Sequence, residues 1–316
     1  MDDPPRVLVC DKLHRAGIEM LKDAGFEVTV AEGISYEELL RTIPEYDVIV
    51  VRSRTKVDRD VMLAAKRLKV VARVGAGTDN IDMDAANGLG IKVVCAGEAV
   101  ANATAELTLG LMLALSRSIC SLCDEVKKGG WPKGKYEGVE LMGKTVGIIG
   151  VGRIGRRVAE LTRAFGMEVL LNDVAPIPGD FLKKVSGKVM PLVDLLKASD
   201  YITLHVPLTP STRHLINKEN IRLIKHGAFL INTSRGAVID EDALYEALVT
   251  GRLRGAALDV YSVEPPVNRK LLELPNVICT PHIGAQTLEA QERASVEVAS
   301  KIIESFSYTT VRKNPV

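Results

Sequence analysis

Three ionisable residues in the second half of the chain each follow an apolar stretch of the length of a β-strand. They are Arg235, Glu264 and His282. A lone arginine or glutamate is usually a surface ion-pair group. The carboxyl ends of parallel strands, however, meet at one edge of a sheet, where α/β proteins keep their reactive groups. Because histidine exchanges protons near neutral pH, we expect these residues to form a site for proton-transfer chemistry.

Five histidines are present, and their surroundings rank them as candidates. His282 lies in Thr-Pro-His-Ile-Gly-Ala, between a predicted strand and a predicted helix. His205 also ends a predicted strand and is the main alternative. His14, His214 and His226 lie in polar or helix-edge surroundings, so we expect them to be solvated or to cap helices.

A nucleotide-binding pattern occupies 144–173, in the middle of the chain. It consists of a short apolar strand, the spacing G-x-G-x-x-G at Gly150, Gly152 and Gly155, a helix, a second strand and Asp173. The three glycines allow in turn a tight turn, close approach of a pyrophosphate, and tight packing of helix on strand. The helix N-terminus offers N–H groups to phosphates, and the acid would bond the ribose and repel the extra phosphate of NADP. In this complete βαβ context we predict NAD binding rather than an ordinary glycine-rich turn.

Strand and helix patterns alternate before and after this element, which indicates parallel sheets with helices on their faces. The fold class is therefore α/β, with two Rossmann-like, doubly wound parallel-sheet domains. Because the fingerprint lies in mid-chain, we expect an NAD-binding domain at 99–285. It would be inserted into a flavodoxin-like substrate domain made of 1–98 and 286–316. One long helix is predicted over 103–127.

The composition is that of an ordinary globular protein: 316 residues, 47% hydrophobic and 26% charged, with a net charge of +1. This balance favours neither nucleic acid nor an anionic membrane as a partner. The acidic N-terminus opens into a strand and does not read as a signal peptide. Five scattered cysteines fit a reduced, cytoplasmic protein.

The pair Cys120-x-x-Cys123 lies inside a helical pattern. It has no second cysteine pair and no histidine nearby, so we expect two thiols packed on one helix face rather than zinc or redox chemistry. We expect no metal site.

Runs of residues spread over almost the whole chain resemble the D-isomer-specific 2-hydroxyacid dehydrogenase family, and within it the members that act on D-3-phosphoglycerate. The matching runs are 51–57, 73–82, 105–108, 138–155, 232–236, 257–266 and 281–285. Members of this family transfer a hydride between a 2-hydroxy acid and NAD.

The resemblance implies roles for the three ionisable residues. His282 would be the acid/base, Glu264 its partner, and Arg235 the group that holds the substrate. These roles agree with the chemistry, because the base should titrate near neutrality and a carboxylate beside it favours the imidazolium. An arginine fork matches a substrate carboxylate.

The resemblance also implies two sets of binding residues. The cofactor contacts would be Thr104, Gly150, Gly152, Arg153, Ile154, Gly155, Asp173, Val206, Thr233, Asp259, His282, Gly284 and Ala285. The substrate contacts would be Arg52, Ser53, Gly75, Ala76, Gly77 and Arg235. Arg52 is placed to bind a phosphate, and Lys133 and Lys135 could add charge. Ala76 departs from the threonine that phosphoglycerate-specific members often carry.

We therefore predict an NAD-dependent dehydrogenase that oxidises D-3-phosphoglycerate to 3-phosphooxypyruvate in serine synthesis. A glyoxylate or hydroxypyruvate reductase is the alternative on the same scaffold, and an NAD-sensing corepressor-like protein is the alternative of another class. We expect a cytoplasmic homodimer, because the helix over 103–127 looks too apolar for a free surface. The end at residue 316 predicts a form without the regulatory domain of longer family members.

Overall fold

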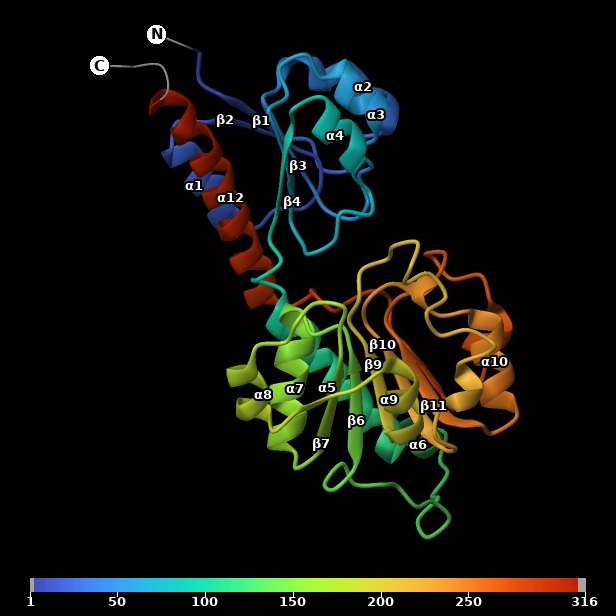
Figure 1. The fold of residues 1–316 in the computed structure, drawn as a ribbon. Coiled ribbons are helices and arrows are strands. Elements are labelled where there is room, and N and C mark those ends of the chain that lie inside the picture. The colour runs from blue at the N-terminus through green and yellow to red at the C-terminus, as the bar shows by residue number, and fades with distance from the viewer. Residues whose placement is uncertain (1–2, 312–316) are drawn as a thin grey trace. The chain divides into compact units, whose positions relative to one another are not determined.

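The computed structural model describes residues 3–311, with side chains up to residue 307. The chain divides into two compact units. Unit 1 contains the described residues up to Val100 and those from Ala285 onward, and unit 2 is Ala101–Gly284. Each unit is a parallel sheet with helices on both faces (Figure 1). The predicted fold class is therefore confirmed.

Unit 1 has a five-stranded parallel sheet in the order β2-β1-β3-β4-β5. Its strands are β1 (Arg6–Val9), β2 (Glu27–Val30), β3 (Val48–Val51), β4 (Val70–Arg73) and β5 (Lys92–Cys95). The central strands are short runs of β-branched residues, which suit a sheet that is covered on both faces. Helices α1 (Arg15–Asp23) and α12 (Leu288–Val311) cover one face. The other face is covered by α2 (Tyr36–Thr42), η1 (Ile43–Glu45), α3 (Arg59–Ala64) and α4 (Met83–Gly88).

Unit 2 has a seven-stranded parallel sheet in the order β12-β11-β10-β9-β6-β7-β8. Its strands are β6 (Thr145–Ile149), β7 (Glu168–Asn172), β8 (Lys188–Val189), β9 (Tyr201–Leu204), β10 (Ala228–Asn232), β11 (Leu253–Leu258) and β12 (Val277–Cys279). The strand order reverses between β6 and β9. In open α/β sheets such a switch point is where ligands bind, beyond the carboxyl ends of the strands.

Two helical layers enclose this sheet (Figure 1). One layer contains α5 (Ala101–Arg117), α7 (Arg153–Ala164) and α8 (Gly179–Val185). The other contains α9 (Leu192–Ala198), η2 (Ile221–Leu223), η3 (Gly236–Val238), α10 (Glu241–Val249) and α11 (Arg269–Leu272). Because both faces are covered, polar side chains can act only from the strand ends and the loops that follow them.

Helix starts follow local side-chain chemistry. Asp240 accepts hydrogen bonds from the backbone N–H groups of Asp242 and Ala243, and Ser35 forms a capping box with Glu38. His14 caps α1, one of the two roles expected for it.

The predicted long helix over 103–127 is wrong in one respect. The helix breaks at Ser118, which has φ +45°, and α6 (Ile119–Lys127) leaves at 62° to α5. The thiols of Cys120 and Cys123 are free and exposed on α6, so the expectation that they pack is also wrong. No single helix among the described residues is long and apolar enough to cross a membrane, although the bent pair α5–α6 together meets that measure.

The last helix, α12, begins at Leu288 and continues to Val311. Residues 312–316 of the predicted substrate domain lie outside the described residues. Elements α8, β8 and α9 are short, and their sequence periodicity is too brief to have indicated them.

Candidate active site

Most of the residues singled out in unit 2 lie at one edge of its sheet. The glycine turn follows β6, Asp173 follows β7, and Val206 follows β9. Thr233 and Arg235 follow β10, Asp259 and Glu264 follow β11, and His282 follows β12. Since all these strands are parallel, their carboxyl ends bring residues that are far apart in sequence to one edge.

The glycine turn has the geometry that its spacing predicts. Gly150 has φ +92°, and a Cβ atom at Gly155 would lie 2.0 Å from the Gly150 carbonyl oxygen. A Cβ atom at Gly152 would meet nothing within 4 Å. The turn is therefore closed on the side of the protein and open at Gly152, which caps the twelve-residue helix α7. An open backbone at a helix N-terminus fits a pyrophosphate.

Asp173 is tied to the same turn. Its Oδ2 accepts a hydrogen bond from the Val151 N–H at 2.6 Å, and its Oδ1 accepts one from the Ala175 N–H at 2.8 Å. Each carboxylate oxygen has a second lone pair, so a ribose hydroxyl could still be bound. The carboxylate thus fits the dinucleotide expected here, and it braces the turn as well.

His282 and Glu264 meet, as the resemblance implies. The His282 Nδ1 lies 2.8 Å from Glu264 Oε2, and about two-fifths of each side chain is exposed. Burial alone would raise the pKa of the Glu264 carboxyl, but the hydrogen bond from His282 and the nearby positive charges hold it below its ordinary value. An ionised carboxylate can only accept a hydrogen bond, so Nδ1 carries the proton and the neutral ring has its lone pair on Nε2.

The loop that carries His282 is held by Asp259, which is 1% exposed. The Asp259 carboxylate accepts hydrogen bonds from Thr280 Oγ1 at 2.7 Å, Ile283 N at 2.8 Å and Gly284 N at 2.9 Å. His282 itself adopts φ +54°, a conformation that side chains other than glycine seldom take. Its backbone N–H donates to the Asp259 carbonyl oxygen at 2.9 Å. Asp259 therefore positions the histidine, a role that its sequence context did not reveal.

Arg235 lies beside this pair because two loops pack backbone to backbone. A Cβ atom at Gly236 would lie 1.8 Å from the Tyr261 carbonyl carbon, so the loops after β10 and β11 touch there. The positive charge of Arg235 is among the influences that lower the pKa of Glu264. Fully buried Asn232 donates from Nδ2 to the Arg235 carbonyl oxygen at 2.9 Å. The sequence analysis did not single out Asn232, although a polar residue at the end of an apolar strand could have indicated it.

His205, the alternative histidine, does not have this setting. Its Nε2 lies 2.9 Å from Thr203 Oγ1, and burial lowers its pKa to about 3. Its Nδ1 is buried without a hydrogen-bond partner among the described residues. The imidazole is therefore neutral at physiological pH, and no carboxylate of the described residues forms a hydrogen bond with it. His282 thus remains the predicted site of proton transfer.

The other predicted contacts fall into both units. In unit 2, Thr104 and Thr233 are buried, and Thr233 Oγ1 lies 2.9 Å from Thr108 Oγ1. Arg153 and Ile154 open α7. The remaining predicted residues lie in unit 1: Arg52, Ser53, Gly75, Ala76, Gly77 and Ala285. Their roles in binding remain predictions.

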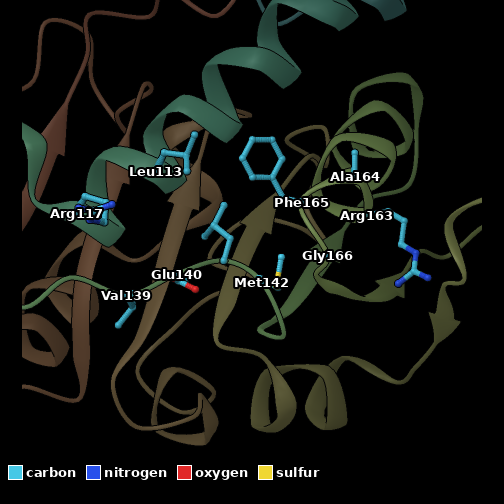
Figure 2. A pocket seen from close by; sticks show the side chains of 10 residues that line it. Leu113, Arg117, Val139, Glu140, Met142, Arg163, Ala164, Phe165 and Gly166 are labelled. Carbon is cyan, nitrogen blue, oxygen red and sulfur yellow. The ribbon is translucent and has the colours of Figure 1, made fainter.

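A hollow of about 660 Å³ lies elsewhere on unit 2. Figure 2 shows it between the end of α5 at Arg117, the end of α7 at Phe165, and the segment around Met142. Gly166 and Met142 precede β7 and β6, so the hollow is at the amino edge of the sheet. It is therefore separate from the edge that carries His282.

Residues 109–284 match the family described as D-isomer specific 2-hydroxyacid dehydrogenase, NAD binding domain. The chain is similar to the D-3-phosphoglycerate dehydrogenase of Methanocaldococcus jannaschii, with 49% identity over 94% of this chain and 56% of that protein. It is also similar to the hydroxypyruvate reductase of Thermotoga maritima, with 46% identity over 95% of this chain and 98% of that protein. A solved glyoxylate reductase from Paecilomyes thermophila has a TM-score of 0.88, with 32% identity over 96% of this chain and 95% of that one. The chain spans about half the length of the phosphoglycerate dehydrogenase it matches.

The glycine turn gives a paired prediction. Gly155→Ala should lower the free energy of unfolding by about 1–3 kcal/mol, because its methyl group meets a backbone carbonyl that cannot move aside. Gly152→Ala should leave the thermal unfolding midpoint near that of the wild type but weaken NAD binding, because its methyl group occupies the open side. Thermal unfolding and calorimetric titration with NAD measure both effects. Equal NAD affinity in Gly152→Ala and wild type would contradict this account of the turn.

Proposed function

Because this chain belongs to the D-isomer specific 2-hydroxyacid dehydrogenase family, we propose that it oxidises D-3-phosphoglycerate to 3-phosphooxypyruvate with NAD, as the first step of serine synthesis. The observation that carries this proposal is the contact of 2.8 Å between His282 and Glu264, in the unit that matches the NAD-binding domain. The similarity to a phosphoglycerate dehydrogenase supports the choice of substrate.

Each side chain has a distinct task in this reaction. The Nε2 lone pair of His282 takes the proton of the substrate hydroxyl. Glu264 fixes the ring and favours the imidazolium that forms. The Arg235 guanidinium binds the substrate carboxylate, and in the reverse direction it polarises the 2-oxo group. Bound NAD supplies the acceptor for the hydride from C2.

The acid/base assignment predicts two different kinetic effects. His282→Ala should lower kcat by about 10²–10⁴-fold with NAD binding retained, as expected for loss of a general base. Glu264→Gln removes the carboxylate that fixes the ring and stabilises the imidazolium formed in the reaction, so kcat should fall, but by a smaller factor than in His282→Ala. NADH formation from D-3-phosphoglycerate measures both effects.

The same assay separates the enzyme from an NAD-sensing binding protein. Such a protein would bind NAD in both the wild type and His282→Ala but would form no NADH. Absence of turnover with a panel of D-2-hydroxy acids and 2-oxo acids would contradict the proposed activity.

A hydroxypyruvate or glyoxylate reductase is the second candidate. The hydroxypyruvate reductase of Thermotoga maritima matches over nearly its whole length, and Ala76 is a departure from the phosphoglycerate-specific pattern. The two candidates differ by one phosphate group on the substrate. Arg52, half-buried just after β3, is the cation that we propose binds this phosphate.

Substitution of Arg52 discriminates between the two candidates. Arg52→Met should raise KM for D-3-phosphoglycerate by about tenfold or more, as for loss of a charge-assisted contact, with a much smaller effect on glyoxylate. Steady-state kinetics with both substrates measure this. Similar changes for both substrates would favour the reductase.

We also propose a homodimer, although the apolar face of α5 does not support it as expected, because that face is mostly buried within unit 2. The support comes instead from α6 and the loop after it. Ile119 and Val126 on α6 are about half exposed, and Trp131 is 75% exposed. Large apolar groups of this kind commonly mark protein interfaces.

Sedimentation velocity measures the assembly directly. The wild type should sediment as a dimer, and Ile119→Asp with Val126→Asp should shift the population towards monomer, because charges are poorly accommodated in a buried interface. A monomeric wild type at micromolar concentration would rule the dimer out.

We further propose a cytoplasmic location. All five cysteines lie among the described residues, and none of them is in a disulfide, which suits a compartment that keeps thiols reduced. Fractionation of the source cells would test this.

A further inference from the structure

The two arginines that flank Ser53 are in opposite situations. The Arg54 guanidinium donates to Asp11 Oδ1 at 2.9 Å, to the Cys10 carbonyl oxygen at 3.0 Å and to Thr55 Oγ1 at 3.2 Å. The Arg52 guanidinium forms no hydrogen bond or ion pair in the part of the chain that the structure describes. Arg54 is thus committed to the fold, whereas Arg52 is half-buried with its donors available.

A buried carboxylate binds residues 52–55, which we call the arginine segment. Asp11, two residues beyond β1, is 5% exposed. Besides the Arg54 contact, it accepts hydrogen bonds from Arg52 N at 2.6 Å, Thr55 N at 3.2 Å and Thr55 Oγ1 at 2.9 Å. Four donors from a segment of four residues converge on one carboxylate, so loss of its charge would loosen both ends of the segment.

The side-chain amide of Asn80 binds the same segment. Asn80 Nδ2 donates to the Arg52 carbonyl oxygen at 2.7 Å and to the Thr55 carbonyl oxygen at 2.5 Å. Its Oδ1 accepts from Arg73 Nε at 3.3 Å. The Arg73 side chain lies against Gly75, where a Cβ atom would be 2.1 Å from Arg73 Nη1. Asn80 therefore connects the segment after β3 to the Gly75 loop after β4.

Together the two side chains leave the backbone little freedom. Asp11 and Asn80 bind the N–H and the C=O of both Arg52 and Thr55. A side chain projecting from such a backbone loses less conformational freedom when it binds an anion. We call Asp11, Asn80 and Thr55 the clamp. Their side chains form hydrogen bonds within unit 1, and the Arg52 guanidinium remains available to a ligand.

We infer that Asp11 and Asn80 are positioning residues that fix the Arg52 guanidinium for phosphate binding and so set the preference for phosphorylated over unphosphorylated substrates. This inference rests on the proposed function, which assigns the substrate phosphate to Arg52. It extends that function by naming two residues that would not touch the substrate. Their effect should therefore appear as selectivity between two acids that differ only in the phosphate.

Asp47 provides a matched control. It is a buried carboxylate in the same unit, 2% exposed, and accepts hydrogen bonds from Arg6 N at 3.0 Å and from Arg67 Nη2 and Lys69 Nζ at 3.1 Å. It precedes β3, whereas Arg52 follows that strand, so the two lie at opposite ends of it. Asp47→Asn removes a comparable buried charge without touching the arginine segment.

The experiment compares 3-phosphooxypyruvate with hydroxypyruvate, its unphosphorylated counterpart, as substrates of the NADH-dependent reduction. Asp11→Asn and Asn80→Ala should each raise KM for the phosphorylated acid by about tenfold, as for a displaced binding group. In Asp11→Asn the KM for hydroxypyruvate and both kcat values should stay within about threefold of wild type. Asn80→Ala should raise the KM for hydroxypyruvate as well, but by less than for the phosphorylated acid, because Asn80 also contacts Arg73 beside the Gly75 loop. Asp47→Asn should leave the KM ratio unchanged. Thr55→Val, which removes one hydrogen bond to Asp11, should shift the ratio in the same direction by less.

Thermal unfolding shows which variants are folded. If Asp11→Asn does not fold, Thr55→Val still tests the inference. In the double variant Arg52→Met with Asp11→Asn, the KM ratio should be no worse than in Arg52→Met alone, because both changes act on one contact. If Arg52→Met shifts the ratio but the three clamp variants do not, positioning by the clamp is refuted and the phosphate site stands. If Arg52→Met leaves the ratio unchanged, the proposed phosphate site fails and the inference falls with it.

Discussion

The hydrogen bonds that Asp259 accepts from the loop after β12 are the constraint on which the candidate site depends. They hold His282 at a positive φ, where the Nδ1 atom reaches Glu264. A histidine on an untethered loop would spend part of its time in other conformations, and proton transfer is sensitive to small displacements. The buried Asp259 carboxylate therefore controls the geometry of the His282 imidazole indirectly, through its hydrogen bonds to the neighbouring residues of the loop.

The same arrangement recurs in both units. Apolar strands bring the chain to the edge of a parallel sheet, and polar side chains at the ends of the strands or in the loops after them then fix those loops. Asp259 and Asn232 do this in unit 2, and Asp11 and Asn80 do it in unit 1. Buried polar groups are costly unless every donor and acceptor is satisfied. Here their hydrogen bonds go to the loops that carry the predicted reactive or ligand-binding residues. The bonds that satisfy the buried groups therefore also position those loops.

Ionisable residues of the same type differ in their pairing and in their burial. Arg54 is neutralised by Asp11, whereas Arg52, two residues away, has no such partner among the described residues. Glu264 is held ionised by His282 and Arg235 despite its partial burial, while burial keeps His205 neutral. Residues of one chemical type thus acquire different capacities from their surroundings, as expected when desolvation and nearby charges compete.

The sequence by itself determined the strands other than β8, because short apolar runs between turn residues leave little alternative. It also determined the glycine turn, whose three positions have distinct steric requirements, and the family, whose motifs span most of the chain. The pairing of His282 with Glu264 could be expected only through that family resemblance. The sequence indicated the helix at 103–127 but not its break at Ser118, since both parts have helical periodicity.

Only the tertiary structure decided which polar residues are partners. Asp11 meets Arg54 across 43 positions, and Asp259 meets Gly284 across 25. Local periodicity carries no information about such contacts, because they depend on which strands become neighbours and how closely their loops pack. The burial that distinguishes His205 from His282, and the contacts that distinguish Arg54 from Arg52, arise only when the sheets assemble.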